Sequence, residues 1–280
     1  MLEACLESVK GADEIIIVDT GSVDKTKEIA AKYTDKIYDF TWCDDFAKAR
    51  NFAREKCTKT WILSIDADER MQAGGIQELK RNLYTEAEAI NIYMKSAIHR
   101  YPVPRFFKNI PSTFWIGRIH ETINKTGTIN CNVEMEFGSS PAHEYDPDRN
   151  IRILEAAYKD DPTNKRTMFY LGREYGYRKD WEKAEEIFEK YIKDESSMFM
   201  PERADTFFML AVCYWYDGKG NGEKARECAL KALMINPYFK APILLLAEMV
   251  LPENKQQWIR LAETADDRNT LFSRSRWDII

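Results

Sequence analysis

The chain has 280 residues and a mass of 32.8 kDa, which allows two domains or one large one. Its 41 basic and 46 acidic residues give a net charge of −5, which argues against a non-specific nucleic-acid binder, because such proteins need a basic surface. No apolar run reaches the roughly 18 residues of a membrane span, and the N-terminus lacks the pattern of a signal peptide. We therefore expect a cytoplasmic protein, free or peripheral at the inner face of a membrane.

Cysteine and histidine are too sparse to suggest a structural metal site. The six cysteines form no Cys-x-x-Cys pair, and there are only three histidines. Because free cysteine is among the most buried residue types, we expect reduced thiols that mostly fill the core.

Residues 1 to about 145 alternate β-branched runs with amphipathic segments. Apolar residues at positions 2, 5, 6 and 9 predict a helix over Leu2–Val9. Strands are predicted over 14–18, 36–40, 61–65 and 89–94, and helices over 25–33, 46–57 and 76–83. This order is typical of an α/β fold with a doubly wound, mostly parallel sheet. Ligands on such a sheet bind beyond the carboxyl ends of the strands.

From residue 148 to the end, the pattern is almost wholly helical. The stretch YLGREY at Tyr170–Tyr175 is echoed by MLAVCY at Met209–Tyr214, and small residues follow both at helical spacing. Leu210 follows Leu171 by 39 positions, near the tetratricopeptide period of about 34. The sequence thus predicts an all-α array of short tetratricopeptide-like helix pairs, with domains over 1–147 and 148–280.

Tyrosines of this helical region suggest a surface for a protein partner. We expect the concave face of the array to carry exposed aromatic side chains from Tyr170, Tyr177, Tyr214 and Tyr216, because stacked helix pairs leave a groove for extended partners. The alternative is that the tyrosines fill the spaces between helices, Tyr175 and Tyr214 foremost.

Two acidic turns follow predicted strands of the first region. Asp66 and Asp68 can present oxygen ligands to Mg²⁺ or Mn²⁺ holding a nucleotide diphosphate, although a solvated acidic turn is the alternative. In the earlier turn Gly21 permits close approach of a ligand, and Asp19 and Thr20 can hydrogen-bond a base or ribose. Capping of the following helix is the alternative for this turn.

An ordered set of motifs resembles the family 2 glycosyltransferases of the GT-A fold, and in its later part the bacterial subgroup with a tetratricopeptide tail. The motifs are DEIIIVDTGSVDKT at 13–26, AKARNFA at 47–53, WILSIDADE at 61–69, RFFKN at 105–109, GRIHE at 117–121 and AHEY at 142–145. The resemblance extends over essentially the whole chain, and it implies the fold and a sugar-transfer reaction.

The resemblance also implies a donor site. Asp19 and Thr20 match the turn that holds the nucleoside of the sugar donor. Arg50 and Asn51 match the element that borders the nucleotide pocket, although a surface ion pair is the alternative for Arg50. Asp66 matches the first carboxylate of the motif that binds metal and diphosphate.

Metal and acceptor residues are implied in the same way. Asp68 matches the second carboxylate of the metal motif, and His143 lies where a late histidine returns to the cation. His120 and Glu121 match the acceptor-side His-Glu pair. Glu121 is the expected base, and its alternative role is to orient His120 or Arg118.

The implied chemistry is a single displacement that inverts the anomeric carbon. The cation neutralises charge on the departing diphosphate, and a carboxylate takes the proton of the acceptor. Arg105 and Lys108 can stabilise phosphates or be ordinary solvated charges. The acceptor nucleophile, a hydroxyl or another group, would belong to a saccharide, a lipid-linked saccharide or a protein side chain.

Two other functions compete with this interpretation. A non-catalytic scaffold would combine a degenerate transferase domain with a partner-binding helical tail. A sugar-nucleotide pyrophosphorylase would need a glycine-rich basic loop after its first strand, and none is visible. The family pattern begins with a strand and a Lys-Asn-Glu-like turn before the helix at Leu2–Val9, and both are missing here. We expect either an internal methionine at position 1 or a naturally shortened, inactive relative.

Overall fold

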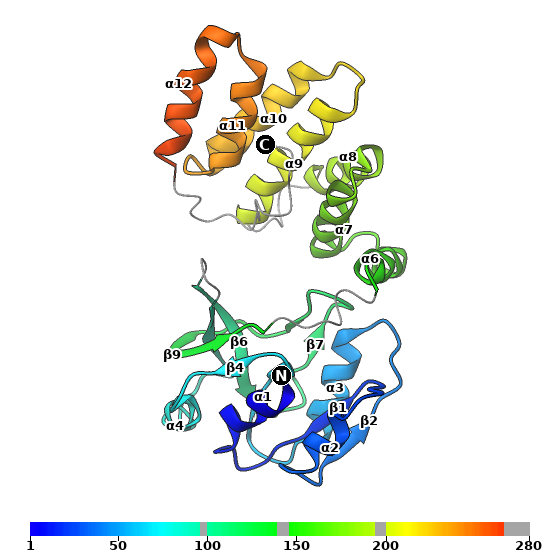
Figure 1. Cartoon of the computed structure of the whole chain (residues 1–280), viewed down its shortest axis with the longest axis vertical. Helices are drawn as coiled ribbons and strands as arrows, with labels where there is room; N and C mark the ends of the chain where they lie inside the picture. Colours follow the sequence, from blue (N-terminus) through cyan, green and yellow to red (C-terminus); the bar gives the residue numbers. More distant parts are fainter. Residues whose placement is uncertain (96–99, 139–145, 194–199, 266–280) are drawn as a thin grey trace. The chain divides into compact units, whose positions relative to one another are not determined.

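The computed structural model describes residues 1–95, 100–138, 146–193 and 200–265. The chain divides into two compact units, Met1–Arg149 and a second that begins at Asn150 (Figure 1). Each unit has its own secondary-structure class, α/β in the first and all-α in the second. The predicted order of classes is confirmed.

The first unit interleaves short helices and strands. In chain order they are α1 (Leu2–Val9), β1 (Ile17–Asp19), α2 (Thr26–Ala30), β2 (Ile37–Asp39), α3 (Phe46–Lys56), β3 (Trp61–Leu63), β4 (Arg70–Met71), α4 (Gly75–Lys80), β5 (Ala89–Lys95), β6 (Arg100–Lys108), β7 (Trp115–Ile116), β8 (Thr122–Ile123) and β9 (Ile129–Glu136). Each predicted helix and strand of this region is therefore present, mostly with shorter bounds.

The strands form a mixed arrangement, which corrects the expectation of a mostly parallel sheet. β1 and β2 pair in parallel, with Ile17 opposite Ile37. A five-stranded sheet has the order β3-β6-β5-β9-β4. Of its four neighbouring pairs, β5–β9 is parallel and the other three are antiparallel. The reason is that β6 follows β5 after a short connection and pairs with it antiparallel, so no crossover helix is needed.

Apolar side chains fill both faces of β3. Trp61, Leu63 and Ile65 pack against a core cluster that contains Val9 of α1. Ile62 packs against a second cluster, which contains Ala47 of α3. Because successive strand residues point to opposite faces, α1 and α3 lie on opposite sides of β3. Helix α3 thereby brings its charged residues to the end of this strand.

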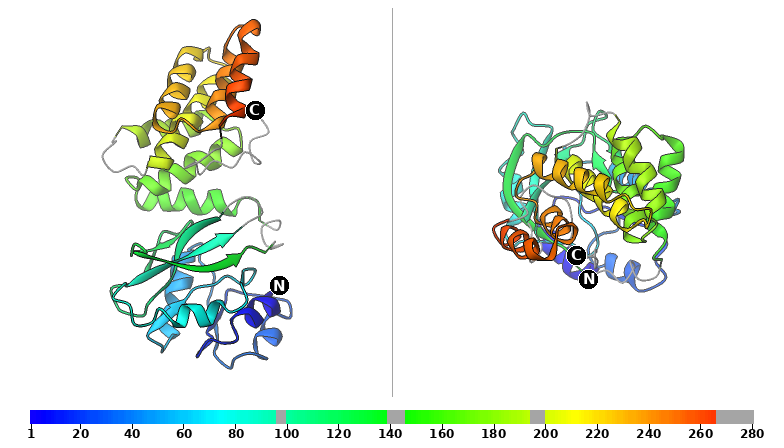
Figure 2. Two further views of the ribbon diagram at one scale, coloured as in Figure 1. Left: turned by 90° about the vertical axis from the view of Figure 1, so that its left-hand side faces the viewer. Right: turned by 90° about the horizontal axis from the view of Figure 1, so that it is seen from above.

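The second unit is a series of helix pairs (Figure 2). Its helices are α6 (Arg149–Asp160, which starts one residue earlier), α7 (Lys165–Tyr177), α8 (Trp181–Ile192), α9 (Met200–Tyr216), α10 (Gly222–Ile235), α11 (Lys240–Met249) and α12 (Pro252–Glu263). α7 packs on α8, α9 on α10, and α11 on α12. The pairing agrees with the repeat predicted from the sequence.

Gly172 of α7 lies directly against the ring of Phe188 on α8. A methyl group built there would lie 2.6 Å from the ring of Phe188 on α8, and Phe188 is fully buried. We predict that Gly172→Ala lowers the free energy of unfolding of this unit by about 1–3 kcal/mol, the cost of overpacking a core. Urea denaturation measures it, and adding Phe188→Leu should restore part of the loss. An additive double variant would contradict the close contact.

The tyrosines of the second unit mostly fill the spaces between helices and are not exposed on a concave face. Tyr175 and Tyr214 are buried, and their hydroxyls donate to Glu155 and Glu189 at 2.8 and 2.7 Å. The remaining tyrosines of the predicted concave face are half-buried: Tyr170, Tyr177 and Tyr216. The expectation of exposed tyrosines is therefore wrong, because neighbouring helices enclose them.

The cysteine prediction is confirmed. All six cysteines are free thiols, and four of them are buried: Cys5, Cys131, Cys213 and Cys228. Within the described parts of the chain, no helix combines the length and the apolar character that crossing a membrane requires.

Candidate active site

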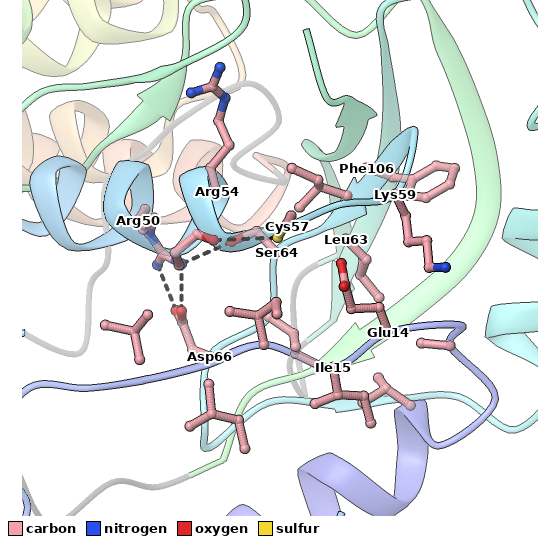
Figure 3. A pocket seen from close by; sticks show the side chains of 18 of the residues that line it. Glu14, Ile15, Arg50, Arg54, Cys57, Lys59, Leu63, Ser64, Asp66 and Phe106 are labelled. Atoms are coloured by element: carbon pink, nitrogen blue, oxygen red, sulfur yellow. Dashed lines mark hydrogen bonds and ion pairs between the residues drawn. The ribbon is translucent and has the colours of Figure 1, made fainter. Parts of the chain in front are cut away.

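Arg50 of α3 is the centre of the charged site (Figure 3). Its guanidinium makes a fork with Asp66, with Nη1 at 2.7 Å from Oδ1 and Nη2 at 3.0 Å from Oδ2. Its Nε donates to Oε1 of Glu121 at 2.6 Å, and Nη1 also donates to Ser64 Oγ at 3.1 Å. Figure 3 shows Arg50 extending from α3 toward Asp66, whereas Arg54 points away. One cation thus holds two carboxylates from distant parts of the sequence.

Trp115 of β7 supports this arginine. The Arg50 guanidinium carbon lies 4.8 Å from the centre of the Trp115 ring, a cation–π contact. Asn51 anchors the same strand, since its amide donates to the Trp115 carbonyl at 3.0 Å and accepts from the Trp115 amide at 2.9 Å. The structure therefore places Asn51 as the support of β7.

Arg105 joins the half-buried Asp66 and the buried Glu69 in one network. Burial disfavours the charged form of Asp66, but Arg50 and then Arg105 outweigh it and hold the pKa of Asp66 at about 2. Burial and then the Asp66 charge raise the pKa of Glu69 to about 7. Arg105 Nη2 lies 3.2 Å from Glu69, and its Nη1 is buried with no hydrogen-bond partner among the described residues. The site therefore retains one unsatisfied donor.

The Asp66 carboxylate is paired with Arg50 and Arg105, whereas the Asp68 carboxylate can bind a ligand. It is half-buried and makes no hydrogen bond or ion pair within the described residues. Its backbone carbonyl faces Gly138, where a methyl group would lie 2.1 Å from the oxygen. A side chain at position 138 would collide with this turn, so the end of the β9 segment lies directly against Asp68.

The donor set suits a metal ion that is shared with a diphosphate. The described residues contain no cluster of three or more His, Cys, Asp or Glu side chains that could hold a metal alone. Mg²⁺ bound through phosphates needs only one or two carboxylates from the protein, and the Asp68 carboxylate fits that requirement. His143, the other predicted ligand, lies outside the described residues.

The first acidic turn is built around Asp19. This carboxylate is only 4% exposed and accepts from the backbone amides of Gly21 and Ser22, at 3.3 and 3.1 Å. It also lies 3.6 Å from Lys27 Nζ. Thr20, at the tip, is exposed. Asp19 therefore shapes the turn through its hydrogen bonds, and Thr20 beside it is accessible to solvent.

His120 and Glu121 lie in a turn that follows β7. His120 is half-buried and adopts a positive φ of 52°, an uncommon backbone conformation for a residue with a side chain. The Glu121 side chain is only 10% exposed, and it forms an ion pair with Arg50. Strain of this kind is concentrated at functional sites.

The sequence motifs identified most members of this network but not its connections. Ser64 and Trp115 were not predicted, and a Phe-Trp pair before the Gly-Arg-Ile-His-Glu motif was the available signal for Trp115. Lys108 lies elsewhere, with Nζ at 3.4 Å from the carbonyl of Glu86 and 5.7 Å from the Trp61 ring. Arg105 joins the site and Lys108 does not.

A cavity of about 450 Å³ opens beside this network. Its polar end includes Thr20, Arg50 and Asp66, and most of its remaining wall is apolar. Figure 3 shows Arg50, Ser64 and Asp66 together at this end, away from Glu14 and Lys59. The charged site is therefore open to a ligand at the ends of β1 and β3.

Comparison with known proteins defines the class of the first unit. Residues 1–138 match the sequence model of Glycosyl transferase family 2. The first unit is a family 2 glycosyltransferase domain, and the helical unit follows it.

Individual relatives carry related names. A TPR repeat-containing protein of Synechococcus elongatus is 37% identical over 131 residues, which cover 44% of this chain and 32% of that protein. The SPbeta prophage-derived glycosyltransferase SunS of Bacillus subtilis is 29% identical over 194 residues, 62% of this chain and 46% of SunS. The lipopolysaccharide core biosynthesis glycosyltransferase LpsC of Rhizobium meliloti is 33% identical over 93 residues, 32% of this chain and 34% of LpsC. The chain thus matches 32–46% of the length of these relatives.

Proposed function

We propose that the protein transfers a sugar from a nucleotide-activated donor to an acceptor nucleophile, with a divalent cation and with inversion at the anomeric carbon. The observation that carries this proposal is the bridge that Arg50 makes between Asp66 and Glu121, at 2.7 and 2.6 Å. It joins the carboxylate expected on the donor side to the carboxylate expected on the acceptor side. Asp66 lines the polar end of the cavity, and the Arg50 bridge holds Glu121 beside it.

The charge balance of the site explains the need for a cation. Two guanidiniums, Arg50 and Arg105, face the carboxylates Asp66, Glu69 and Glu121, and the Asp68 carboxylate lies in the same turn as Asp66 and Glu69. A diphosphate would therefore enter a site without excess positive charge. Asp68, with His143 as proposed second ligand, would hold Mg²⁺ or Mn²⁺, which when bound neutralises charge on the departing diphosphate.

Arg105 is suited to bind the donor directly. Its buried Nη1 is an N–H donor without a partner among the described residues, and leaving such a donor unsatisfied costs stability. A phosphate oxygen at this position would accept that hydrogen bond. Arg105 then positions the diphosphate, while Thr20 at the exposed tip of the first turn contacts the nucleoside.

Glu121 is the proposed base. Arg50 donates to one oxygen of its carboxylate at 2.6 Å, which leaves the other oxygen to accept a proton. As the acceptor oxygen forms its bond to the anomeric carbon, its proton passes to Glu121 and the bond to the diphosphate breaks with the electron pair on the leaving oxygen. Attack from the face opposite the leaving group inverts the configuration.

We predict that Glu121→Gln lowers kcat by about 100- to 10,000-fold, the usual contribution of a general base. Glutamine keeps the hydrogen bond from Arg50, so the KM for the donor should stay unchanged. Steady-state kinetics of the two proteins measure both quantities, and Glu121→Asp should retain part of the activity. A rise in donor KM with an unchanged kcat would assign Glu121 to orienting His120 or Arg118.

The scaffold alternative makes a different prediction about binding. A degenerate domain would retain the Arg50 bridge as an ion pair and would bind no nucleotide. Calorimetric titration of the protein with uridine, guanosine, cytidine and thymidine diphosphates, each with Mn²⁺ and with EDTA, separates the two functions. Binding of one nucleotide that requires Mn²⁺ supports the transferase, and no binding under either condition contradicts it.

The acceptor is proposed by class. A saccharide, free or lipid-linked, agrees with the printed name of LpsC, and a protein side chain is the other class. We further propose that the helical unit binds a protein partner or a macromolecular acceptor, as stacked helix pairs do in related arrays. Half-buried Tyr170 and Tyr177 flank the Arg173 guanidinium there, at 4.5 and 5.7 Å from its carbon. Transfer assays with each acceptor class distinguish these targets.

A further inference from the structure

Four residues of α7 alternate arginine and tyrosine along one face of the helix. They are Arg166, Tyr170, Arg173 and Tyr177, which follow one another at intervals of four, three and four positions. Residues at these intervals are neighbours on a helix surface. All four are exposed or half-buried, whereas Gly172, outside this stripe, lies against α8. We call the four residues the Arg–Tyr ladder.

The tyrosine rings of the Arg–Tyr ladder contact its guanidiniums. The Arg166 guanidinium carbon lies 5.0 Å from the centre of the Tyr170 ring, and the Arg173 carbon lies 4.5 Å from the same centre. Arg173 also lies 5.7 Å from the Tyr177 ring and 5.7 Å from the ring of the buried Phe169. These are cation–π contacts, which position a guanidinium without using its N–H groups. The ladder thus brings two positive charges to one tyrosine ring.

The two arginines of the ladder differ in their charge partners. Arg166 Nη1 lies 3.4 Å from Oε1 of Glu202 on α9. Arg173 makes no hydrogen bond or ion pair within the described residues. Its Nε is buried without an acceptor among those residues, whereas its Nη1 and Nη2 are not buried. Arg173 can therefore gain charge-assisted hydrogen bonds when a ligand supplies the acceptor.

The carboxylates of α9 are engaged by other groups. Glu202 gives one oxygen to Arg166, and its second oxygen accepts from the hydroxyl of the buried Tyr191 at 3.2 Å. Burial raises the pKa of Glu202, and the charge of Arg166, followed by that of Arg173, opposes the rise. Asp205 is fully buried and makes no hydrogen bond with Arg173. The ladder therefore has one guanidinium more than the Glu202 carboxylate can bind.

We propose that the Arg–Tyr ladder binds an acidic, extended segment of a protein partner and holds a carboxylate of that segment on Arg173. The inference rests on the proposed binding of a partner by the helical unit, and it names the chemistry of that partner. A carboxylate can accept two parallel N–H bonds from Nη1 and Nη2 of one guanidinium. Its single charge matches one unpaired guanidinium, whereas a phosphate group carries nearly two charges. Clusters of arginine recognise acidic motifs in this way.

The dimensions of the ladder set the length of the segment. Arg166 and Tyr177 are 11 positions apart, which corresponds to about 16 Å along a helix. An extended chain covers that length with about five residues. The half-buried rings of Tyr170 and Tyr177 offer apolar surface on either side of Arg173. We therefore expect an acidic residue at the centre of the segment and apolar residues beside it.

The test is a titration of the full chain with the peptide Ser-Leu-Glu-Leu-Ser, with blocked ends, up to about 10 mM, since millimolar affinity corresponds to only about 4 kcal/mol. The control peptide has Gln in place of Glu, which removes the charge and keeps the size. NMR of the ¹⁵N-labelled arginine Nε–H groups follows binding, and Arg173→Gln assigns the Arg173 signal by its loss. This signal should shift with the Glu peptide and stay in place with the Gln peptide. Raising the salt from about 0.05 to about 0.5 M should weaken binding by at least about threefold, because salt screens exposed charges.

Variants of the ladder separate its charge from its fold. Arg173→Gln should raise the Kd of the Glu peptide by at least about tenfold, because the bidentate pair is lost. Arg173→Lys keeps the charge but not the planar fork, so its Kd should lie between the two. Arg226→Gln is the matched control, because Arg226 is an exposed arginine of α10 in the same unit. Its Kd should equal that of wild type, and the Tm of each variant should stay within a few degrees of wild type.

Three results would overturn the inference: equal binding of the Glu and Gln peptides, an unchanged Kd in Arg173→Gln, or no binding of either peptide. Oligoglucuronate is titrated in parallel, and tighter binding of this acidic saccharide than of the Glu peptide would overturn the assignment to a protein segment. Equal binding of both peptides would leave the helical unit as a partner-binding module without preference for acid. None of these measurements needs a nucleotide, a sugar donor or a metal, so their failure leaves the proposed sugar transfer untouched.

Discussion

Replacing Arg50 with methionine is expected to lower the free energy of unfolding of the first unit by about 3–5 kcal/mol, the usual cost of removing one partner from a buried ion pair. The Arg50 side chain is only 16% exposed, and it neutralises both Asp66 and Glu121. Methionine fills a similar volume against Trp115, but it leaves Glu121 without its cation and Asp66 with Arg105 alone, at 3.5 Å. Urea denaturation followed by tryptophan fluorescence measures the loss.

Lys48→Met on the same helix is the matched control. Lys48 is 64% exposed and lies 3.6 Å from Asp45, so its removal should change stability by less than about 0.5 kcal/mol. Equal losses in the two variants would show that the bridge contributes nothing beyond a surface charge.

The pH dependence of the Arg50→Met effect follows from Asp66. Its pKa of about 2 in the fold lies below its ordinary value of 3.8, so the ionised form stabilises the native state. That contribution is complete above about pH 4 and is lost as the pH falls toward 2. The difference between wild type and Arg50→Met should therefore shrink over this range. A constant difference would contradict the ion pair as its cause.

Asp68→Asn is expected to reduce metal-dependent sugar transfer by at least about 100-fold, because a Lewis-acid contribution is worth several kcal/mol and 1.36 kcal/mol corresponds to tenfold. Asparagine is similar in size, and the Asp68 carboxylate has no partner to lose within the described residues. The Tm should therefore stay within a few degrees of wild type. Activity at a series of Mn²⁺ concentrations measures the effect.

Asp39→Asn controls for the loss of a negative charge in the same unit. Asp39 is 75% exposed and pairs with Lys27 at 2.5 Å, and it belongs to β2. Its activity and metal dependence should match those of wild type. If Asp68→Asn retained full activity at limiting Mn²⁺, Asp68 would have no part in holding the cation.

Local periodicity was enough to predict the helices of the first unit and its strands β1, β2, β3 and β5. The stripe of α1 and the apolar run of β3 are short-range patterns, and the structure has both. β6 was missed because Pro102 and Pro104 and its charged residues interrupt any alternation. β9 carried a usable signal, since Cys131, Val133 and Met135 alternate with polar residues and are buried. The mixed direction of the sheet depends on that hairpin and on β9, so it could not follow from the earlier strands.

The candidate site was predictable as a set of residues and not as a network. Motif order assigned Arg50 and Asp66 to the donor side and Glu121 to the acceptor side, but the 71 positions between Arg50 and Glu121 carry no local signal of their contact. Stacking of Arg50 on Trp115 likewise depends on tertiary packing. The motif implied that Asn51 borders the nucleotide pocket, but it could not show that the Asn51 amide hydrogen-bonds the backbone of Trp115 in β7.

The most direct test of the account is a ¹H NMR assay of the full chain with Mn²⁺ and a panel of nucleotide-activated sugars, together with saccharide, lipid-linked and protein acceptors. The account predicts that one donor is consumed, that free nucleoside diphosphate appears, and that the new bond has the opposite anomeric configuration to the donor. EDTA should abolish the reaction. A product that retains the donor configuration would contradict the single displacement through Glu121, and consumption of no donor with any acceptor would contradict the proposed transferase.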